Sequence, residues 1–263
     1  MKTSVSPIIV ALLFIMLAFK QDVPPRLQLF LLIGQSNMAG RGVPEAEDQQ
    51  PHPRIWMLDK AESWVPARDP MHFDKPAVIG VGPGFAFAKK LAGTYPTMNI
   101  GLVPCAVGGS GIDDWKTGAY YDPTKSYPYD DALRRAKKAL ENGQLVGFIW
   151  HQGESDSTPE KAPVYEAKLE ELVTRFRKDL NAPNVPFLVA TLGDFVVKRN
   201  PNAKTVNDAL KNATQHISNS YYVLSSGLTD KGDSTHFDTR SARTLGERYA
   251  DVFIQKKMIK EKP

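Results

Sequence analysis

Almost continuously apolar runs recur along the chain, each bounded by turn-forming residues. They cover residues 27–33 (LQLFLLI), 98–104 (MNIGLVP), 145–151 (LVGFIWH), 185–192 (VPFLVATL) and 220–226 (SYYVLSS). Short continuous runs of this kind are typical of strands that are buried on both faces. The pattern therefore predicts a mostly parallel five-stranded sheet.

Amphipathic segments with helical spacing separate these runs. They begin at residues 84, 128, 158, 202 and 238, and Thr158 followed by Pro159 marks the expected start of the third helix. Strands that alternate with helices indicate an α/β fold with helices on both faces of the sheet. Residues 40–83 do not follow the alternation, and we expect a long insertion of the kind that shapes a site.

The first twenty residues differ from the rest of the chain. Lys2 is followed by a run of about a dozen apolar residues that ends at Lys20, which suits a signal peptide and is short for a membrane span. We expect a secreted or periplasmic protein with a signal peptide at 1–20 and a single domain at 21–263. The alternative is an uncleaved N-terminal anchor.

Charge and cysteine content exclude two further classes. The formal charge is +4, of which Lys2 and Lys20 contribute 2 and the tail 256–263, with four lysines and one glutamate, contributes 3, so the body carries −1. A basic face for nucleic acid is therefore not expected. The single cysteine, Cys105, lies in an apolar run and predicts a core residue rather than a disulfide. The sequence leaves the oligomeric state open.

Polar residues with catalytic capability follow the predicted strands. Gln35, Ser36 and Asn37 come after the first strand, a Gly108–Gly109 turn after the second, and His151, Gln152 and Glu154 at the end of the third. Ligands of such sheets bind beyond the carboxyl ends of the strands. We therefore expect these groups to meet at one edge.

Ser36 is either a helix cap or a nucleophile. Asp233 and His236, three residues apart, supply a carboxylate and an imidazole base in the chain order Ser, Asp, His, as acyl transfer requires. Gly109 can present a backbone N–H to an oxyanion. The other histidines, His52, His72, His151 and His216, compete with His236 for the role of base.

Three other kinds of site fit the sequence less well. The G-x-S-x-G elbow is absent because Met38 replaces its second glycine, and neither phosphate-binding glycine motif occurs. His151 and Glu154 are spaced like metal ligands, but a third ligand at recognisable spacing is missing. From the residues we therefore expect no metal site.

The motifs GQSNMAGRG, GVGPGFAFAKKL, GLVPCAVGGSGIDDW, WHQGESD and DSTHFD occur in this order. Together they resemble the SGNH-hydrolase superfamily, and within it the sialate O-acetylesterase-like group that includes acetylxylan esterases of carbohydrate esterase family six. The resemblance spans roughly residues 27–252. It implies a flavodoxin-like three-layer fold and a serine esterase mechanism without a metal or an organic cofactor.

The resemblance also implies roles for individual residues. Ser36 would be the nucleophile and, with Gly109 and Gln152, would form the oxyanion hole. His236 would act as general base and then as acid, oriented by Asp233. Glu154 is the alternative or auxiliary acid, because the glutamate of the HQGE block can itself support the histidine.

The expected substrate is an acetylated carbohydrate, with acetylated xylan or its oligosaccharides placed first. Trp64 and Trp115 in the loops, together with His151, are candidate sugar contacts, and Trp56 is a further stacking candidate. The alternatives are an esterase for O-acetyl sialic acid or another small ester, a non-catalytic carbohydrate-binding relative, and a lipid-directed esterase. No stable membrane partner is expected once the signal peptide is cleaved.

Overall fold

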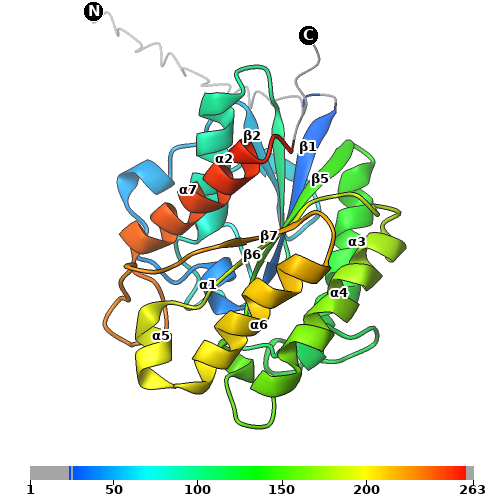
Figure 1. The fold of residues 1–263 in the computed structure, drawn as a ribbon. Coiled ribbons are helices and arrows are strands. Elements are labelled where there is room, and N and C mark those ends of the chain that lie inside the picture. The colour runs from blue at the N-terminus through cyan, green and yellow to red at the C-terminus, as the bar shows by residue number, and fades with distance from the viewer. Residues whose placement is uncertain (1–23, 25, 259–263) are drawn as a thin grey trace, which may run out of the picture.

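The computed structural model describes residue 24 and residues 26–258, so the predicted signal peptide at 1–20 lies outside the described residues. A seven-stranded sheet forms the centre of the molecule (Figure 1). Its order is β3-β2-β4-β1-β5-β6-β7, and every neighbouring pair is parallel except β2 and β3. The strands are β1 (Leu27–Gly34), β2 (Ile55–Leu58), β3 (Trp64–Pro66), β4 (Ile100–Pro104), β5 (Gly143–His151), β6 (Phe187–Ala190) and β7 (Ser220–Val223).

The predicted mostly parallel α/β sheet is confirmed, but its strand count is not. The five apolar runs form β1, β4, β5, β6 and β7, whereas β2 and β3 come from the 40–83 insertion. These two strands are only four and three residues long. The edge strand β3 is partly exposed and pairs with one neighbour, whereas β2 is apolar throughout but only four residues long, shorter than the runs that indicate a strand.

The helices are α1 (Ser36–Ala39), α2 (Pro83–Thr94), α3 (Pro128–Leu140), α4 (Tyr165–Asp179), α5 (Asp194–Arg199), α6 (Asn202–His216) and α7 (Thr239–Gln255). Five of them match the predicted amphipathic segments, but α4 starts seven residues later than expected. Thr158 instead closes a turn, in which its hydroxyl oxygen accepts from the Lys161 N–H and its carbonyl from the Ala162 N–H. A short 3₁₀ helix, Ala162–Val164, then leads into α4.

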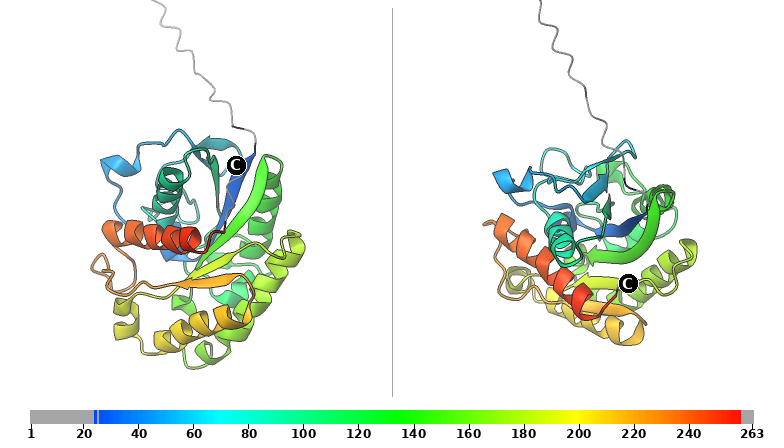
Figure 2. Two further views of the ribbon diagram at one scale, coloured as in Figure 1. Left: turned by 45° about the horizontal axis from the view of Figure 1, so that its top comes forward. Right: turned by 90° about the horizontal axis from the view of Figure 1, so that it is seen from above.

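Alternate residues of β1 build two separate cores, which makes the fold three-layered (Figure 2). Phe30 packs edge-on against Phe87 of α2 and Phe253 of α7, with ring centroids 4.8 and 5.2 Å apart. Leu31 and its odd-numbered neighbours in β1 face the core formed with α3, α4 and α6. Each face of the sheet is therefore covered by its own set of helices.

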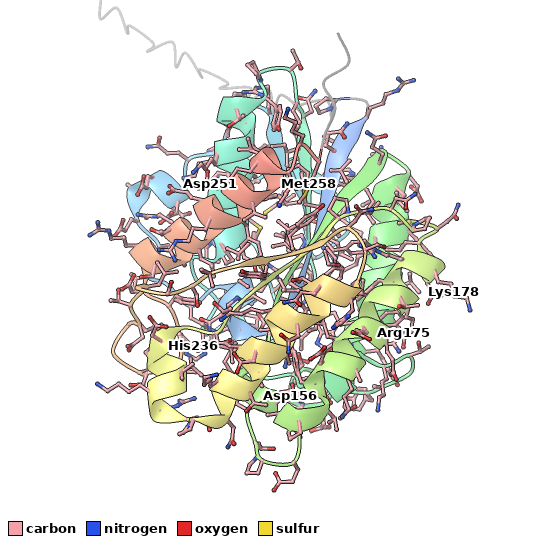
Figure 3. All side chains as sticks on the ribbon, in the orientation of Figure 1. Asp156, Arg175, Lys178, His236, Asp251 and Met258 are labelled. Carbon is pink, nitrogen blue, oxygen red and sulfur yellow. The ribbon has the colours of Figure 1, made fainter. Side chains whose placement is uncertain are left out.

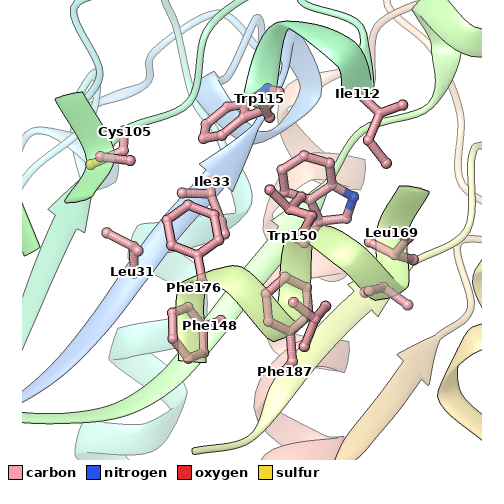
Figure 4. Packing of buried hydrophobic residues seen from close by; sticks show 14 of the residues in the cluster. Leu31, Ile33, Cys105, Ile112, Trp115, Phe148, Trp150, Leu169, Phe176 and Phe187 are labelled. Atoms are coloured by element: carbon pink, nitrogen blue, oxygen red, sulfur yellow. The ribbon is translucent and has the colours of Figure 1, made fainter. Parts of the chain in front are cut away.

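The second core is rich in aromatic rings (Figure 4). Trp115 meets Trp150 at 5.2 Å in an edge-to-face arrangement, and Phe148 stacks on Phe187 at 5.3 Å. Cys105 lies at the border of this core and is free, as predicted. Among the residues that the structure covers, no helix is long and apolar enough to cross a membrane.

Candidate active site

Ser36 lies at the carboxyl end of β1, where the chain turns sharply into α1. Gly34 has φ +126°, and a Cβ there would lie 2.1 Å from the His151 carbonyl oxygen, so β1 and β5 approach closely only because this residue is glycine. Gln35 remains extended, and Ser36 is the first residue of α1. The serine is thereby fixed at the edge where the sequence predicts the site.

The imidazole of His236 lies between Ser36 and Asp233. Its Nε2 is 3.0 Å from the Ser36 hydroxyl oxygen, and its Nδ1 is 2.7 Å from a carboxylate oxygen of Asp233. The second oxygen of Asp233 accepts hydrogen bonds from the backbone N–H groups of Thr235 and His236, at 2.9 and 2.8 Å. Figure 3 shows His236 beside α5, away from Met258, which follows the end of α7. A serine, a histidine and an aspartate are thus connected in one hydrogen-bonded chain.

The surroundings of Asp233 and His236 determine which of these two side chains is charged. Burial alone would raise the pKa of Asp233, but the hydrogen bonds from the His236 ring and from the two N–H groups outweigh it and lower the pKa to about 2. Burial lowers the pKa of His236 from its ordinary value, and the Asp233 carboxylate opposes this effect. At neutral pH the carboxylate is therefore ionised while the imidazole is neutral and able to accept a proton.

Asn37 connects the serine turn to the histidine loop. Its side-chain N–H group donates to the Thr235 carbonyl at 2.9 Å, and its side-chain oxygen accepts from the Phe237 N–H at 3.0 Å. The amide therefore holds the backbone on both sides of His236. The same amide nitrogen also donates to the carboxylate of Glu154.

Glu154 forms a second pair with His151, away from the His236 ring. The Glu154 carboxylate lies 3.8 Å from Nε2 of His151, and both side chains are almost fully buried. Among the described residues, the hydrogen-bond partners of the His236 ring are Asp233 and Ser36, not Glu154. Because His151 is fully buried, the expectation that it contacts substrate is wrong for this conformation.

The Gly108–Gly109 turn lies beside the serine strand. The Val107 N–H donates to the Gly34 carbonyl at 2.9 Å, which places the turn next to β1. The Gly108 N–H donates to Asp74 at 2.7 Å, and the same Asp74 oxygen pairs with Arg41 at 2.9 Å. Gly109 has φ +86°, and its N–H has no acceptor within the described part of the chain. An N–H held in this way is suited to an oxyanion.

Gln152 does not match the oxyanion role expected of it. The residue is fully buried, and its side-chain nitrogen lies within hydrogen-bond distance of Gln35, the Ser110 carbonyl and Asp156. Its oxygen accepts from the Tyr165 hydroxyl at 2.8 Å. The amide nitrogen has two N–H bonds, and three acceptors already lie within their reach, so no N–H is left to donate to an oxyanion. Gln152 instead holds the turns around Ser36 in place.

The comparisons with known proteins agree with this geometry. A family model described as carbohydrate esterase, sialic acid-specific acetylesterase, matches residues 26–255. The chain belongs to this family. Members are carbohydrate acetylesterases, and therefore carboxylic ester hydrolases.

Two relatives show how far the family likeness extends. A probable carbohydrate esterase of Arabidopsis thaliana is 31% identical over 89% of this chain and 93% of its own length. The X-ray structure of the same Arabidopsis protein superposes with a TM-score of 0.78 at 30% identity, covering 88% of this chain and 99% of the other. A probable 9-O-acetyl-N-acetylneuraminic acid deacetylase of Escherichia coli is 26% identical over 60% of this chain and 62% of its own.

Two of the tryptophans expected to contact sugar do not lie on the surface of this acetylesterase. Trp115 is fully buried against Trp150, and its indole N–H donates to the Ser110 hydroxyl at 2.9 Å. Trp56 is buried in the same core. Both are core residues that the sequence cannot distinguish from loop residues, because a tryptophan suits either place.

Trp64 is partly exposed but lies at the wrong edge of the sheet. Its indole N–H donates to Asn142, the residue that precedes β5, at 3.1 Å. Asn142 is therefore at the amino end of β5, whereas Ser36 lies beyond the carboxyl end of β1, the parallel neighbour of β5. The expectation that Trp64 binds substrate is therefore wrong.

Only partial sequence signals mark the residues that hold the site of this acetylesterase in place. Asn37 stands next to Ser36 in the GQSN motif, but nothing in the sequence indicates that it spans 200 residues to reach Phe237. Asp74 lies in the unpatterned insertion, so its pairing with Arg41 has no signal at all. Within the described residues, no group of three or more His, Cys, Asp or Glu side chains is arranged to hold a metal ion.

Proposed function

We propose that the protein removes O-acetyl groups from carbohydrate by a serine esterase mechanism in which Ser36, His236 and Asp233 are the catalytic residues. The observation that carries this proposal is the chain of hydrogen bonds from Ser36 through His236 to Asp233. It joins two segments 200 residues apart at the edge where ligands bind in such sheets.

In the first half-reaction, the Ser36 oxygen attacks the acetyl carbonyl carbon while His236 Nε2 takes the hydroxyl proton. The resulting oxyanion is stabilised by the backbone N–H groups of Ser36 and Gly109. When the C–O bond to the sugar breaks, His236 returns the proton to the departing sugar oxygen. Asp233 stabilises the imidazolium that exists between these two transfers.

In the second half-reaction, water attacks the acetyl-serine and His236 accepts one of its protons. Collapse of the second tetrahedral intermediate breaks the bond to the Ser36 oxygen. His236 then returns the proton to that oxygen, and acetate leaves. The cycle restores the neutral imidazole and needs no further reactant.

We place acetylated xylan or its oligosaccharides first among the substrates. O-acetyl sialic acid is the second candidate, and the observation that favours it is the family description together with the E. coli relative named as a deacetylase of that sugar. The apolar run at the amino end supports a signal peptide, and hence a secreted or periplasmic enzyme that meets glycans outside the cytoplasm.

The proposal is tested by measuring acetate release from acetylated xylan, from O-acetyl sialic acid and from p-nitrophenyl acetate. Ser36→Ala is expected to lose at least about 10³-fold in kcat on every ester that the wild type cleaves. Ser226→Ala, at an exposed serine on the turn after β7, is the matched control. If Ser36→Ala retained wild-type turnover, the mechanism would be wrong, and the ranking of the three rates decides the substrate.

A further inference from the structure

Two exposed tyrosines lie side by side on the loop that leads into α3. Tyr120 and Tyr127 are 48% and 46% exposed, and their ring centroids are 5.1 Å apart. Tyr121 and Ser126 form an antiparallel bridge between them, with a hydrogen bond of 2.8 Å from the Tyr121 N–H to the Ser126 carbonyl. The bridge therefore holds the two rings together as one surface, which we call the tyrosine pair.

The loop that carries the tyrosine pair packs against the Gly108–Gly109 turn. The Tyr121 hydroxyl oxygen lies 3.5 Å from the Gly108 carbonyl oxygen. A Cβ on Gly109 would lie 2.8 Å from the same hydroxyl oxygen. Tyr121 thus separates the tyrosine pair from the N–H that is proposed to bind the oxyanion. The loop of the tyrosine pair is therefore the direct neighbour of the glycine turn.

A cavity of about 490 Å³ continues the same surface. Its walls include Thr124, Lys125 and Ser126 of the loop, and Val107, two residues before Gly109. The volume lies in the range of small-molecule sites. The cavity is therefore contiguous both with the loop of the tyrosine pair and with the glycine turn.

The cavity lining also combines an aromatic ring, Phe73, which has the Arg135 guanidinium over it, with charged and polar groups. Phe73 and Lys60 both line the cavity, and Lys60 has no ion-pair partner among the described residues. Lys125 and Arg134, in contrast, pair with Asp122 and Asp131. Aromatic faces next to hydroxyl, ammonium and guanidinium donors suit a sugar, whose C–H faces are apolar and whose rim of hydroxyl groups accepts and donates hydrogen bonds.

We propose that the tyrosine pair and the adjoining cavity form a subsite for a second sugar of the glycan whose acetyl group lies at Ser36. This inference rests on the proposed function and specifies its substrate as an oligosaccharide or polysaccharide rather than a free monosaccharide. Tyr120 and Tyr127 would stack on the sugar, and Lys60, Lys125 and Ser126 would contact its hydroxyl groups.

The test is the double variant Tyr120→Ser/Tyr127→Ser, assayed on an acetylated xylo-oligosaccharide and on p-nitrophenyl acetate, which carries no sugar. We expect the ratio of kcat/KM on the oligosaccharide to kcat/KM on p-nitrophenyl acetate to fall about tenfold, which corresponds to about 1.4 kcal/mol. The matched control is Tyr222→Ser. Tyr222 is 43% exposed but lies on β7, at the edge of the sheet farthest from β3, and its loss is expected to leave the ratio unchanged.

A binding measurement makes the test independent of turnover. In a Ser36→Ala background, retardation by unacetylated xylan in a native gel is expected to weaken in the double variant and in Tyr127→Ser alone, but not in Tyr222→Ser. An unchanged ratio with unchanged retardation in the double variant would overturn the subsite. Absence of wild-type activity on every ester would instead overturn the proposed function, so the two failures are distinguishable.

Discussion

Two histidine–carboxylate pairs with the same spacing in sequence lie in this molecule and differ in almost every physical property. Asp233 and His236 are 2.7 Å apart, and their side chains are 37% and 24% exposed. His151 and Glu154 are 3.8 Å apart, and their side chains are 0% and 4% exposed. A spacing of three residues therefore does not by itself define a catalytic pair.

Burial determines the protonation state of each pair. Burial lowers the pKa of His151 to about 3 and raises the pKa of Glu154, so both groups are driven toward their neutral forms. Hydrogen bonds hold the pKa of Asp233 at about 2, which keeps its carboxylate charged. The partly exposed pair can stabilise an imidazolium, whereas a charge on the buried pair would carry a large desolvation cost.

The largest expected effect distinguishes the pairs by removing the charge of Asp233. Asp233→Asn keeps the shape but gives the ring a neutral partner, so we expect kcat to fall by about 10⁴-fold, as removal of an orienting carboxylate does in such sites. Steady-state kinetics on p-nitrophenyl acetate measures the loss. A decrease smaller than that of Glu154→Gln would reassign the orienting acid to the buried pair.

A smaller effect is expected where the two pairs are connected, at Asn37. Asn37→Ala removes the hydrogen bonds to Thr235 and Phe237 that hold the backbone on either side of His236. Small displacements of catalytic groups cost up to about 10²-fold in rate, and we expect a loss of that order in kcat with KM little changed. Asn207→Ala, which removes an amide bonded to the Leu192 backbone and not to the backbone on either side of His236, is the control for a general loss of stability. Equal losses in both variants would show that Asn37 has only a structural role.

The sequence predicted well what depends on local pattern. The strands β1, β4, β5, β6 and β7 are continuous apolar runs because both their faces are buried, and Ser36 directly follows one of them, whereas Asp233 and His236 lie in the loop between β7 and α7. Their convergence follows from parallel topology. That part of the site was therefore predictable before any coordinates.

What the sequence could not predict depends on side-chain direction. Gln152 and Trp115 belong to motifs that suggest a role in the site, but their side chains point into the protein. The Gln152 amide donates to interior acceptors, and the Trp115 indole packs on Trp150. Conversely, no motif marks Tyr120 and Tyr127, which lie side by side because of the bridge between Tyr121 and Ser126. Residue type and spacing leave such choices open, because the tertiary contacts that decide them come from distant segments.

The smallest expected effect tests the buried pair directly. Glu154→Gln retains an oxygen that can accept from Asn37, and burial already drives the wild-type carboxyl toward its neutral form. We therefore expect kcat to fall by less than about tenfold, the scale of one lost hydrogen bond.

The pH dependence of kcat/KM compares the two pairs in a second way. The proposed mechanism requires neutral His236, so kcat/KM should fall with decreasing pH through a midpoint below the ordinary histidine value of about 6.5. Glu154→Gln should leave that midpoint in place. Asp233→Asn should move it to lower pH, because the carboxylate that raises the pKa of His236 is gone. A midpoint that moved with Glu154 and not with Asp233 would mean that the buried carboxyl, and not the exposed one, sets the proton affinity of the base.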